Sequence, residues 1–399
     1  MRFVPAYFVP AHASPTYNRA VLNRFISLLP CAAVLSLCVS TAHAFDPPPS
    51  QIAARAWVLL DTQSGQLITG YQHDERFEPA SLTKLMTAYL VFDALKQKKL
   101  KPEQVVPVSE RARRATGSRM FIQTDIAVTV DELLRGMVIQ SGNDATIALA
   151  EAVAGTEDAF VALMNREAKR MGLAATQFVN STGLPEPRHT STARDLAQLT
   201  AALIRDYPEY YPLYSQKQFR YIDITQANRN RLLWRDTTVD GVKTGHTEAA
   251  GYCLISSAKR DNRRLISVVL GAASDAARAA ESQKLLNYGY QNFDTVRLYE
   301  ANQAAATPRV WKGAINNVKL GFPNGLFVTV PKADAANLKA KIETSQPLLA
   351  PLRTGQSIGT LKLELNGKPY HSASVVALED VPVAGIFGRT WDAIRLYLQ

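Results

Sequence analysis

Three short motifs follow one another along this chain and restrict what it can fold into. They are Ser81-Leu82-Thr83-Lys84, then Ser141-Gly142-Asn143, then Lys243-Thr244-Gly245. A serine hydroxyl is a poor nucleophile at neutral pH and needs a base within hydrogen-bond reach. Three residues along a helix place Lys84 on the same face as Ser81, and Lys84 can serve as that base only if burial beside other cations lowers its pKa. The pattern therefore predicts a serine acyl-transfer enzyme whose helix, loop and strand meet at one site.

The first 44 residues have the pattern of an export signal. Arg19 and Arg24 precede an apolar run from Phe25 to Val39, and Ala42-His43-Ala44 is a small-x-small cleavage site. The apolar run is shorter than the roughly 20 residues that span a bilayer. We therefore predict a signal peptide over residues 1–44 and an exported mature chain of about 355 residues, long enough for two domains. An uncleaved membrane anchor is the alternative.

Composition argues against several classes of function. Only Cys253 remains after the leader, so no internal disulfide is expected, and its apolar neighbours predict a core residue rather than a nucleophile. The formal net charge of +10 suits an anionic membrane or cell-wall surface, but no clustered basic and aromatic module indicates nucleic acid binding. No cofactor is expected. No metal is expected either, because metal-ligand spacing is missing among His73, His189, His246 and His371.

The order of predicted elements indicates an α+β fold. Residues 56–71 read as a β-hairpin, and residues 239–271 read as three antiparallel strands followed by a helix over 277–290. Between them, apolar periodicity and capping signals predict helices over residues 81–96, 129–139, 145–154, 157–171 and 196–204, the last preceded by a capping signal at Thr192 and Asp195. We predict that residues 45–295 form one domain, a helical cluster against an antiparallel sheet, with the catalytic groove between the two.

After residue 295 the pattern changes to short strands and turns. Asn324-Gly325 and Asn366-Gly367 are hairpin signals, and residues 296–378 are predicted to form a separate small β-domain that holds none of the motif residues. Residues 379–399 are predicted as an amphipathic helix whose apolar side carries Val383, Ile386, Phe387, Trp391, Ile394 and Leu398. This segment is too short and too charged to span a bilayer, but it suits the membrane interface. A terminal helix packed on the β-domain is the alternative.

Each motif alone has a structural explanation. Ser81 could simply cap a helix, Ser141 and Asn143 favour helix breaks, and Lys243 could be a solvated edge-strand residue. Their combination favours catalysis. In that interpretation Ser141 carries a proton to the leaving amine, Asn143 binds the substrate's amide carbonyl and helps hold the base, and Lys243 anchors an anionic group.

In this order and spacing, the three motifs resemble the active-site signature of penicillin-binding proteins and serine β-lactamases. The resemblance extends to the low-molecular-mass penicillin-binding proteins, which are serine-type D-alanyl-D-alanine carboxypeptidases. The stretches that carry it are residues 243–247, 250–252, 191–195, 228–230 and 232–234. It covers nearly the whole chain and implies a penicillin-binding/β-lactamase-like catalytic domain followed by a small all-β domain.

The resemblance also implies a mechanism. Ser81 would attack the carbonyl between the two terminal D-alanines of a peptidoglycan stem peptide, and β-lactams would inhibit the enzyme by acylating the same residue. The backbone N–H groups of Ser81 and His246 would form the oxyanion hole, next to Gly245 on the substrate-binding strand. Thr244 and Arg278 would bind the terminal carboxylate.

The same resemblance suggests a supporting pair and a location. Asp195 and Arg229 would brace a loop near the groove. The enzyme would be exported and attached peripherally, through its C-terminal helix, to the periplasmic side of the bacterial inner membrane.

Three other functions are open to a chain of this kind. A β-lactamase would need a loop glutamate to activate water, but no Glu-x-x-Leu-Asn stretch lies between Asn143 and Lys243. A D,D-endopeptidase acting on cross-links is less favoured, since such relatives usually lack the extra β-domain and tail. A non-catalytic wall-binding protein could lose Lys84 or Lys243, whereas every motif residue is intact here.

Overall fold

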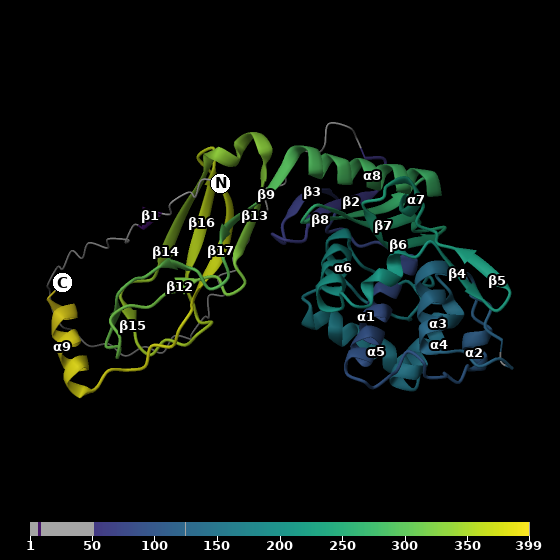
Figure 1. Ribbon diagram of the computed structural model, residues 1–399, viewed down its shortest axis with the longest axis horizontal. Coiled ribbons are helices and arrows are strands. Elements are labelled where there is room, and N and C mark those ends of the chain that lie inside the picture. The colour runs from purple at the N-terminus through teal and green to yellow at the C-terminus, as the bar shows by residue number, and fades with distance from the viewer. Residues whose placement is uncertain (1–6, 9–51, 124, 399) are drawn as a thin grey trace, which may run out of the picture. The chain divides into compact units, whose positions relative to one another are not determined.

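The computed structural model describes residues 7–8, 52–123 and 125–398. Apart from the short strand β1 (Tyr7–Phe8), the expected leader lies outside the described residues. The chain divides into two compact units, one of Ala44–Thr295 and one that comprises Val296–Gln399 and the segment carrying β1 (Figure 1). Each unit has its own hydrophobic core.

The first unit is built on a five-stranded antiparallel sheet with the strand order β3-β2-β8-β7-β6. The hairpin predicted near the start of the domain is present as β2 (Ala56–Asp61) and β3 (Leu67–Tyr71). The three later strands are also present, as β6 (Val239–Thr247), β7 (Gly251–Arg260) and β8 (Arg263–Ala272). Strand β6 lies at the edge of the sheet, next to the helical cluster.

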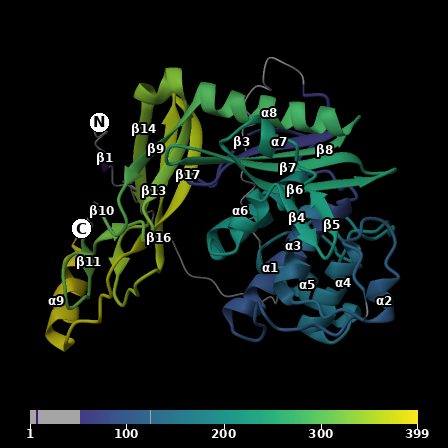
Figure 2. The same cartoon turned by 45° about the vertical axis from the view of Figure 1, so that its right-hand side comes forward.

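Both faces of this sheet are covered, as the apolar runs of its strands require. Successive side chains of β7 alternate: Ile255 joins the core on the helical side, whereas Leu254 packs with α8 (Asp275–Asn292) on the other. Figure 2 shows α8 running along one face while the helical cluster fills the opposite side. Cys253 is a buried core thiol, as predicted.

The predicted helices are present with differences at their ends, whereas three short helical elements, α2 (Glu110–Arg113), η3 (Tyr211–Ser215) and α7 (Leu232–Arg235), were not predicted. Ser81 lies in a 3-10 turn, η1 (Ala80–Thr83), which leads into α1 (Lys84–Lys96), whereas the sequence predicted one helix starting at Ser81. Thr129 and Glu132 form the predicted capping box. The helical elements of this unit are α1 (Lys84–Lys96), α2 (Glu110–Arg113), α3 (Val130–Arg135), the π-helix η2 (Gly136–Gln140), α4 (Asn143–Ala154), α5 (Glu157–Arg170), α6 (Ala193–Asp206), η3 (Tyr211–Ser215) and α7 (Leu232–Arg235).

A small hairpin, β4 (Gln218–Tyr221) and β5 (Ile224–Ala227), completes the unit.

The second unit is mainly a six-stranded sheet with the order β1-β14-β16-β17-β12-β10. Besides β1, the strands of the unit are β10 (Ala304–Ala306), β11 (Val310–Trp311), β12 (Leu320–Gly321), β13 (Leu326–Pro331), β14 (Leu338–Thr344), β15 (Leu348–Leu349), β16 (Ser357–Leu365) and β17 (Lys368–Ala377), together with β9 (Phe293–Tyr299), which begins at the end of the first unit. A 3-10 turn, η4 (Lys332–Asn337), joins β13 to β14.

One of the two hairpin predictions in this unit is right and the other is wrong. Asn366 and Gly367 both have positive φ and connect β16 to its antiparallel partner β17. The turn at Asn324-Gly325 does not join paired strands, because β12 pairs with β10 and β17 while β13 pairs with β9. The local signal marks a turn correctly, but the long-range pairing of each strand decides whether the turn closes a hairpin.

The chain ends in α9 (Ile386–Tyr397). The helix begins later than the predicted segment, because Val383 still pairs with Gly313 in an extended bridge. Over the residues that the structure describes, no helix has the length and apolar content needed to cross a bilayer.

Candidate active site

The turn η1 places the predicted nucleophile and base together. Lys84 Nζ lies 3.0 Å from Ser81 Oγ, within hydrogen-bond distance. The turn is tightly supported: a Cβ atom on Gly183 would lie 1.8 Å from the carbonyl oxygen of Ala80. Gly183 also has a φ of +84°, so both its space and its backbone conformation require glycine.

Lys84 is buried and held by oxygen atoms from three parts of the chain. Besides Ser81, its Nζ donates to Asn143 Oδ1 at 2.7 Å and to the Thr182 carbonyl at 2.7 Å. Burial and, after it, the positive charge of Arg229 lower the pKa of Lys84 from 10.5 to about 7, while Asp144 opposes the change. An amine with this pKa is partly neutral near pH 7 and can therefore accept the proton of the serine hydroxyl.

The Ser141-Gly142-Asn143 motif lies between the π-helix η2 and α4. Ser141 takes a left-handed conformation with a φ of +67°, which ends η2 and starts the turn into α4. Asn143 is held from both sides of its amide: its oxygen accepts from Lys84, and its Nδ2 donates to the Thr116 carbonyl at 2.6 Å. The backbone N–H of Asn143 also donates to the Ser118 carbonyl.

Lys243 lies on β6 and is connected to the second motif. Its Nζ donates to Ser141 Oγ at 2.9 Å and to the Thr244 carbonyl at 2.9 Å. Burial holds the pKa of Lys243 well below its usual range, and the nearby cations Lys84, Arg229 and Arg278 lower it further. Gly245 allows β6 to approach the nucleophile turn, since a Cβ there would lie 3.2 Å from the Pro79 carbonyl oxygen.

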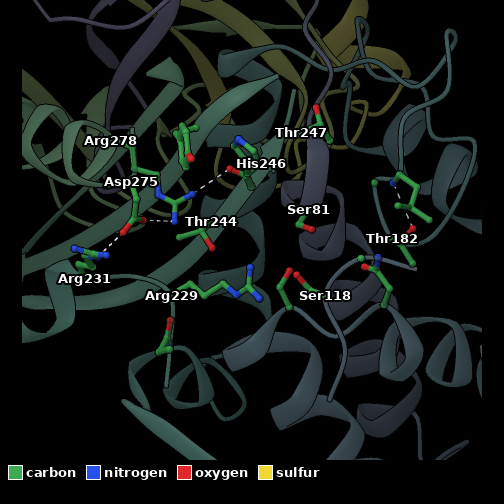
Figure 3. Close-up of a pocket in the computed structure, with 18 of the residues that line it drawn as sticks. Ser81, Ser118, Thr182, Arg229, Arg231, Thr244, His246, Thr247, Asp275 and Arg278 are labelled. Carbon is green, nitrogen blue, oxygen red and sulfur yellow. Dashed lines mark hydrogen bonds and ion pairs between the residues drawn. The ribbon is translucent and has the colours of Figure 1, made fainter. Parts of the chain in front are cut away.

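These elements enclose a cavity of about 840 Å³ (Figure 3). Loop residues 182–184, residues 227–229 and Arg231 complete its wall. Lys84 and Lys243 lie directly behind the wall, connected to it by the hydrogen bonds described above. The predicted site residues that line the cavity are Ser81, Ser141, Asn143, Arg229, Thr244, Gly245, His246 and Arg278.

Asp195 is not among the residues that line this cavity. Its carboxylate accepts hydrogen bonds from Thr176 Oγ1 at 2.7 Å and from the backbone N–H of Ala175 at 3.1 Å. Arg229 lines the cavity and acts electrostatically on Lys84. The Asp195 carboxylate therefore braces the segment at Ala175 and Thr176, and these hydrogen bonds do not involve Arg229.

The sequence interpretation missed several residues of the site. Thr182 supplies a backbone carbonyl to Lys84, a contact that no side-chain pattern could reveal. Asp144 follows the second motif, and its carboxylate accepts from the backbone N–H groups of residues 120–122, which shapes the loop beside Asn143. Arg231 and Asp275 also line the cavity and form an ion pair. In the sequence they are charged residues outside any motif, and such residues suggest only surface positions.

Groups of histidine, cysteine and carboxylate side chains that could hold a metal ion are not found among the described residues. The chemistry that the site supports comes from a serine beside a partly neutral, buried lysine and from a cavity rich in positive charge. Together with the α+β architecture, this arrangement defines a serine acyl-transfer enzyme of the penicillin-binding type.

Comparison with known proteins places this enzyme more narrowly. Residues 41–274 match the D-alanyl-D-alanine carboxypeptidase family, and residues 293–383 match the C-terminal domain of penicillin-binding protein 5. The chain is 44% identical over 377 residues to D-alanyl-D-alanine carboxypeptidase DacC of Escherichia coli (strain K12), covering 92% of this chain and 94% of that relative. The protein therefore belongs to the D-alanyl-D-alanine carboxypeptidase family and is a serine hydrolase.

Solved structures support the same assignment. Penicillin binding protein 5 from Haemophilus influenzae superimposes with a TM-score of 0.80 at 44% identity, covering 84% of this chain and 99% of that chain. Penicillin-Binding Protein D2 from Listeria monocytogenes, solved in an ampicillin-bound form, is 30% identical with a TM-score of 0.57. It covers 61% of this chain and 100% of its own.

Proposed function

We propose that this protein removes the terminal D-alanine from peptidoglycan pentapeptide stems through an acyl-enzyme on Ser81. The observation that carries the proposal is the contact between Ser81 Oγ and Lys84 Nζ, combined with the lowered pKa of Lys84. A nucleophile and a base within hydrogen-bond reach of each other are what covalent acyl transfer requires.

In the acylation step, Ser81 Oγ attacks the carbonyl carbon of the penultimate D-alanine and Lys84 Nζ takes the hydroxyl proton. The backbone N–H groups of Ser81 and His246 receive the oxyanion, a contribution typically worth ~10²–10³ in rate per donor. As the C–N bond breaks, Ser141 passes its hydroxyl proton to the departing amine and takes a proton in return from Lys243, whose Nζ donates to its Oγ. Water attacks the ester in the second half of the cycle and releases the shortened peptide.

The charge of the cavity suits a substrate that ends in a free carboxylate. Arg229, Arg231 and Arg278 all line it, and Lys243 lies behind them. Thr244 and Arg278 are proposed to bind the terminal carboxylate, since arginine reads carboxylates through charge-assisted hydrogen bonds. A β-lactam carries a strained amide and a nearby carboxylate, so it should enter the same cavity and leave a long-lived acyl group on Ser81.

A β-lactamase is a weaker candidate, because the glutamate that contacts the loop at Ser181 already has hydrogen-bond partners for both of its carboxylate oxygens. Glu157 Oε1 accepts from the backbone N–H of Ser181 at 2.9 Å and from Ser181 Oγ at 2.6 Å. Its other oxygen is paired with Arg111. Burial alone would raise the pKa of Glu157, but the hydrogen bonds to Ser181 and Arg111 together lower it. Glu157 therefore fixes the loop that supplies the Thr182 carbonyl and is not available to activate water.

One experiment tests the enzymatic proposal. Labelled penicillin should attach to the peptide that carries Ser81, and Ser81→Ala should abolish the label while the fold is retained. Ser118→Ala, which removes another hydroxyl from the same cavity, is the matched control and should still be labelled. Mass spectrometry of products from a pentapeptide, a cross-linked dimer and a penicillin should show loss of D-alanine from the first. Label on another residue, or cleavage of the dimer alone, would contradict the proposal.

We also propose that α9 attaches the protein to the periplasmic side of the inner membrane after export. The helix is held on the β-domain through its polar side: Asp392 accepts from the backbone N–H of Lys312 at 2.7 Å and pairs with Arg309. Its apolar side is left exposed, with Phe387 at 93% and Leu398 at 77% exposure. Packing on the β-domain, the alternative from sequence, therefore accounts for the polar side of the helix only.

The arrangement suits a membrane interface for an energetic reason. Each large apolar side chain gains about 1.5–3 kcal/mol when it is fully buried. Lys312 and Arg389 line a hollow of about 500 Å³ at the base of the helix, where they could meet anionic headgroups. Insertion of the exposed side chains would thus leave the contact with Asp392 intact.

Vesicle sedimentation tests the attachment without removing the helix. The triple change Ile386→Ser, Phe387→Ser and Leu398→Ser should release the protein into the supernatant while leaving peptide hydrolysis in place. Thr390→Ala on the same helix is the control and should still sediment. Removal of residues 383–399 should give the same release into the soluble periplasmic fraction. Persistent membrane binding in either variant would exclude this role of α9.

A further inference from the structure

The arginine that should bind the substrate carboxylate is already fixed by neutral groups. Arg278 Nη1 donates to the Gly245 carbonyl at 3.1 Å and to the Cys253 carbonyl at 3.4 Å. Its guanidinium also lies over the ring of Tyr252. These contacts come from β6 and β7 and orient the side chain without help from any carboxylate.

The same arginine is nevertheless already bound to a carboxylate of the protein itself. Asp275 Oδ1 accepts from Arg278 Nη2, and Asp275 Oδ2 pairs with Nε of Arg231 (Figure 3). Among the described residues that line the cavity, Asp275 is the sole acidic side chain. One carboxylate thus bridges two arginines inside the proposed carboxylate subsite.

This bridge conflicts with substrate binding as it stands. Arg278 Nη1 donates to the two carbonyls and Nη2 donates to Asp275, so an incoming carboxylate that binds Arg278 through Nη2 must lie beside the Asp275 carboxylate or replace it. Two carboxylates on one guanidinium repel each other. Arg231 offers a second position, because its side chain is 57% exposed and already bonds the other oxygen of Asp275.

We propose that Asp275 occupies the substrate-carboxylate subsite in the free enzyme and that Arg231 holds it aside when the substrate binds. The inference rests on the proposed function, because it concerns the terminal carboxylate of that substrate. Asp275 and Arg231 are positioning residues: they act through Arg278 and set how strongly the enzyme prefers a substrate ending in a free carboxylate.

A simpler role for Asp275 must be distinguished from this one. It is the first residue of α8, directly after the capping residue Ser274, and an acid there stabilises the helix dipole. That role would affect the free energy of unfolding. It would not change the choice between a charged and a neutral substrate, and so selectivity is the informative measurement.

The test uses two thioesters with the same acyl part, one with thioglycolate as leaving group and one with its methyl ester. Thiol release gives kcat and KM for each. Asp275→Asn removes the competing charge and should lower KM for the thioglycolate substrate by about two- to fivefold, the scale of a partly exposed ion pair. Arg231→Ala leaves Asp275 with Arg278 alone and should raise that KM by a similar factor. The ratio of kcat/KM between the two substrates should move in opposite directions in the two variants.

The double variant Arg231→Ala/Asp275→Asn tests whether Arg231 acts through Asp275 or binds the substrate directly. If Arg231 acts by holding Asp275, its loss should have no further effect once Asp275 is neutral, a strong departure from additivity. If the effect of Arg231→Ala persists in that background, Arg231 binds substrate directly and the proposal fails. A rise in KM for Asp275→Asn would also overturn it, because Asp275 would then be orienting Arg278.

Arg297→Ala is the matched control. Arg297 pairs with Glu300 at similar exposure in the second unit, and its loss should leave the selectivity ratio as it is. If the wild-type enzyme releases thiol from neither substrate, the proposed function fails. If the wild type is active but all variants share its selectivity, only the role of Asp275 and Arg231 is refuted.

Discussion

The charge of Arg229 should be visible in the pH dependence of acylation. After burial, Arg229 is the next largest cause that lowers the pKa of Lys84 to about 7. The base is active only when neutral, so acylation should rise with pH and reach half its limit near pH 7 in the wild type. Arg229→Gln keeps a polar side chain but removes the charge. The pKa of Lys84 should therefore rise.

The size of the effect follows from the fraction of neutral amine. With a pKa of about 7, half of the Lys84 side chains are neutral at pH 7, whereas at 10.5 only about one in 3,000 would be. Burial accounts for most of this difference and survives in the variant. A single neighbouring charge typically changes a pKa by about one or more. We expect the midpoint to move up by about one pH unit, so that acylation at pH 6 falls about tenfold while the rates at pH 9 stay close.

The assay is single-turnover acylation between pH 5.5 and 9.5, with the methyl-ester thioester as substrate. This substrate has no carboxylate, so loss of Arg229 as an anion-binding group does not enter the result. Arg231→Gln is the control, because Arg231 lines the same cavity but does not contribute to the pKa of Lys84. An unchanged midpoint in Arg229→Gln would refute the effect of Arg229 on the pKa of Lys84, and a wild-type rate independent of pH would refute the assignment of Lys84 as the base.

Three further results are expected. Gly183→Ala should reduce the acylation rate by ~10² or more, because the new Cβ would push on the Ala80 carbonyl and misplace Ser81. Displacements near 1 Å have costs of this size. A rate near that of the wild type would contradict the proposed packing. Asn143→Ala should slow acylation and lower the melting temperature, because it leaves the buried Lys84 amine without one acceptor, which costs about 1–3 kcal/mol; calorimetry and thiol release measure both. The free energy of unfolding of the wild type, compared with Lys84→Met by chemical denaturation, should increase between pH 7 and 10.5. In that range the unfolded lysine binds a proton that the folded one has lost, and a flat difference would show that the pKa is not lowered.

Much of the fold was predictable because its signals are local. The capping box at Thr129 and Glu132 and the hairpin turn at Asn366-Gly367 depend on residues a few positions apart. The turn at Asn324-Gly325 had an equally strong signal, yet its flanking strands pair elsewhere. Strand pairing across the sheet overrides local turn chemistry, because it depends on distant residues.

The catalytic groups were predictable for a different reason. Covalent chemistry demands particular residue types, so the motifs themselves indicated Ser81, Lys84 and Lys243 as functional residues. How they meet was not contained in those motifs. The contact of Lys84 with Asn143 joins residues 59 positions apart, and that of Lys243 with Ser141 joins residues 102 apart. Such contacts exist only once the helices have packed against β6.

The sequence by itself determined the chemistry of this protein, because an acyl-transfer site needs a serine, a lysine base and cationic groups in a recognisable order. The tertiary structure alone decided the electrostatics of the site. Burial lowers the pKa of Lys84, and folding brings Asp275 between Arg231 and Arg278 while it places Asp195 against Thr176. Desolvation and charge–charge interaction depend on distances through space, and these are set only when the chain is packed.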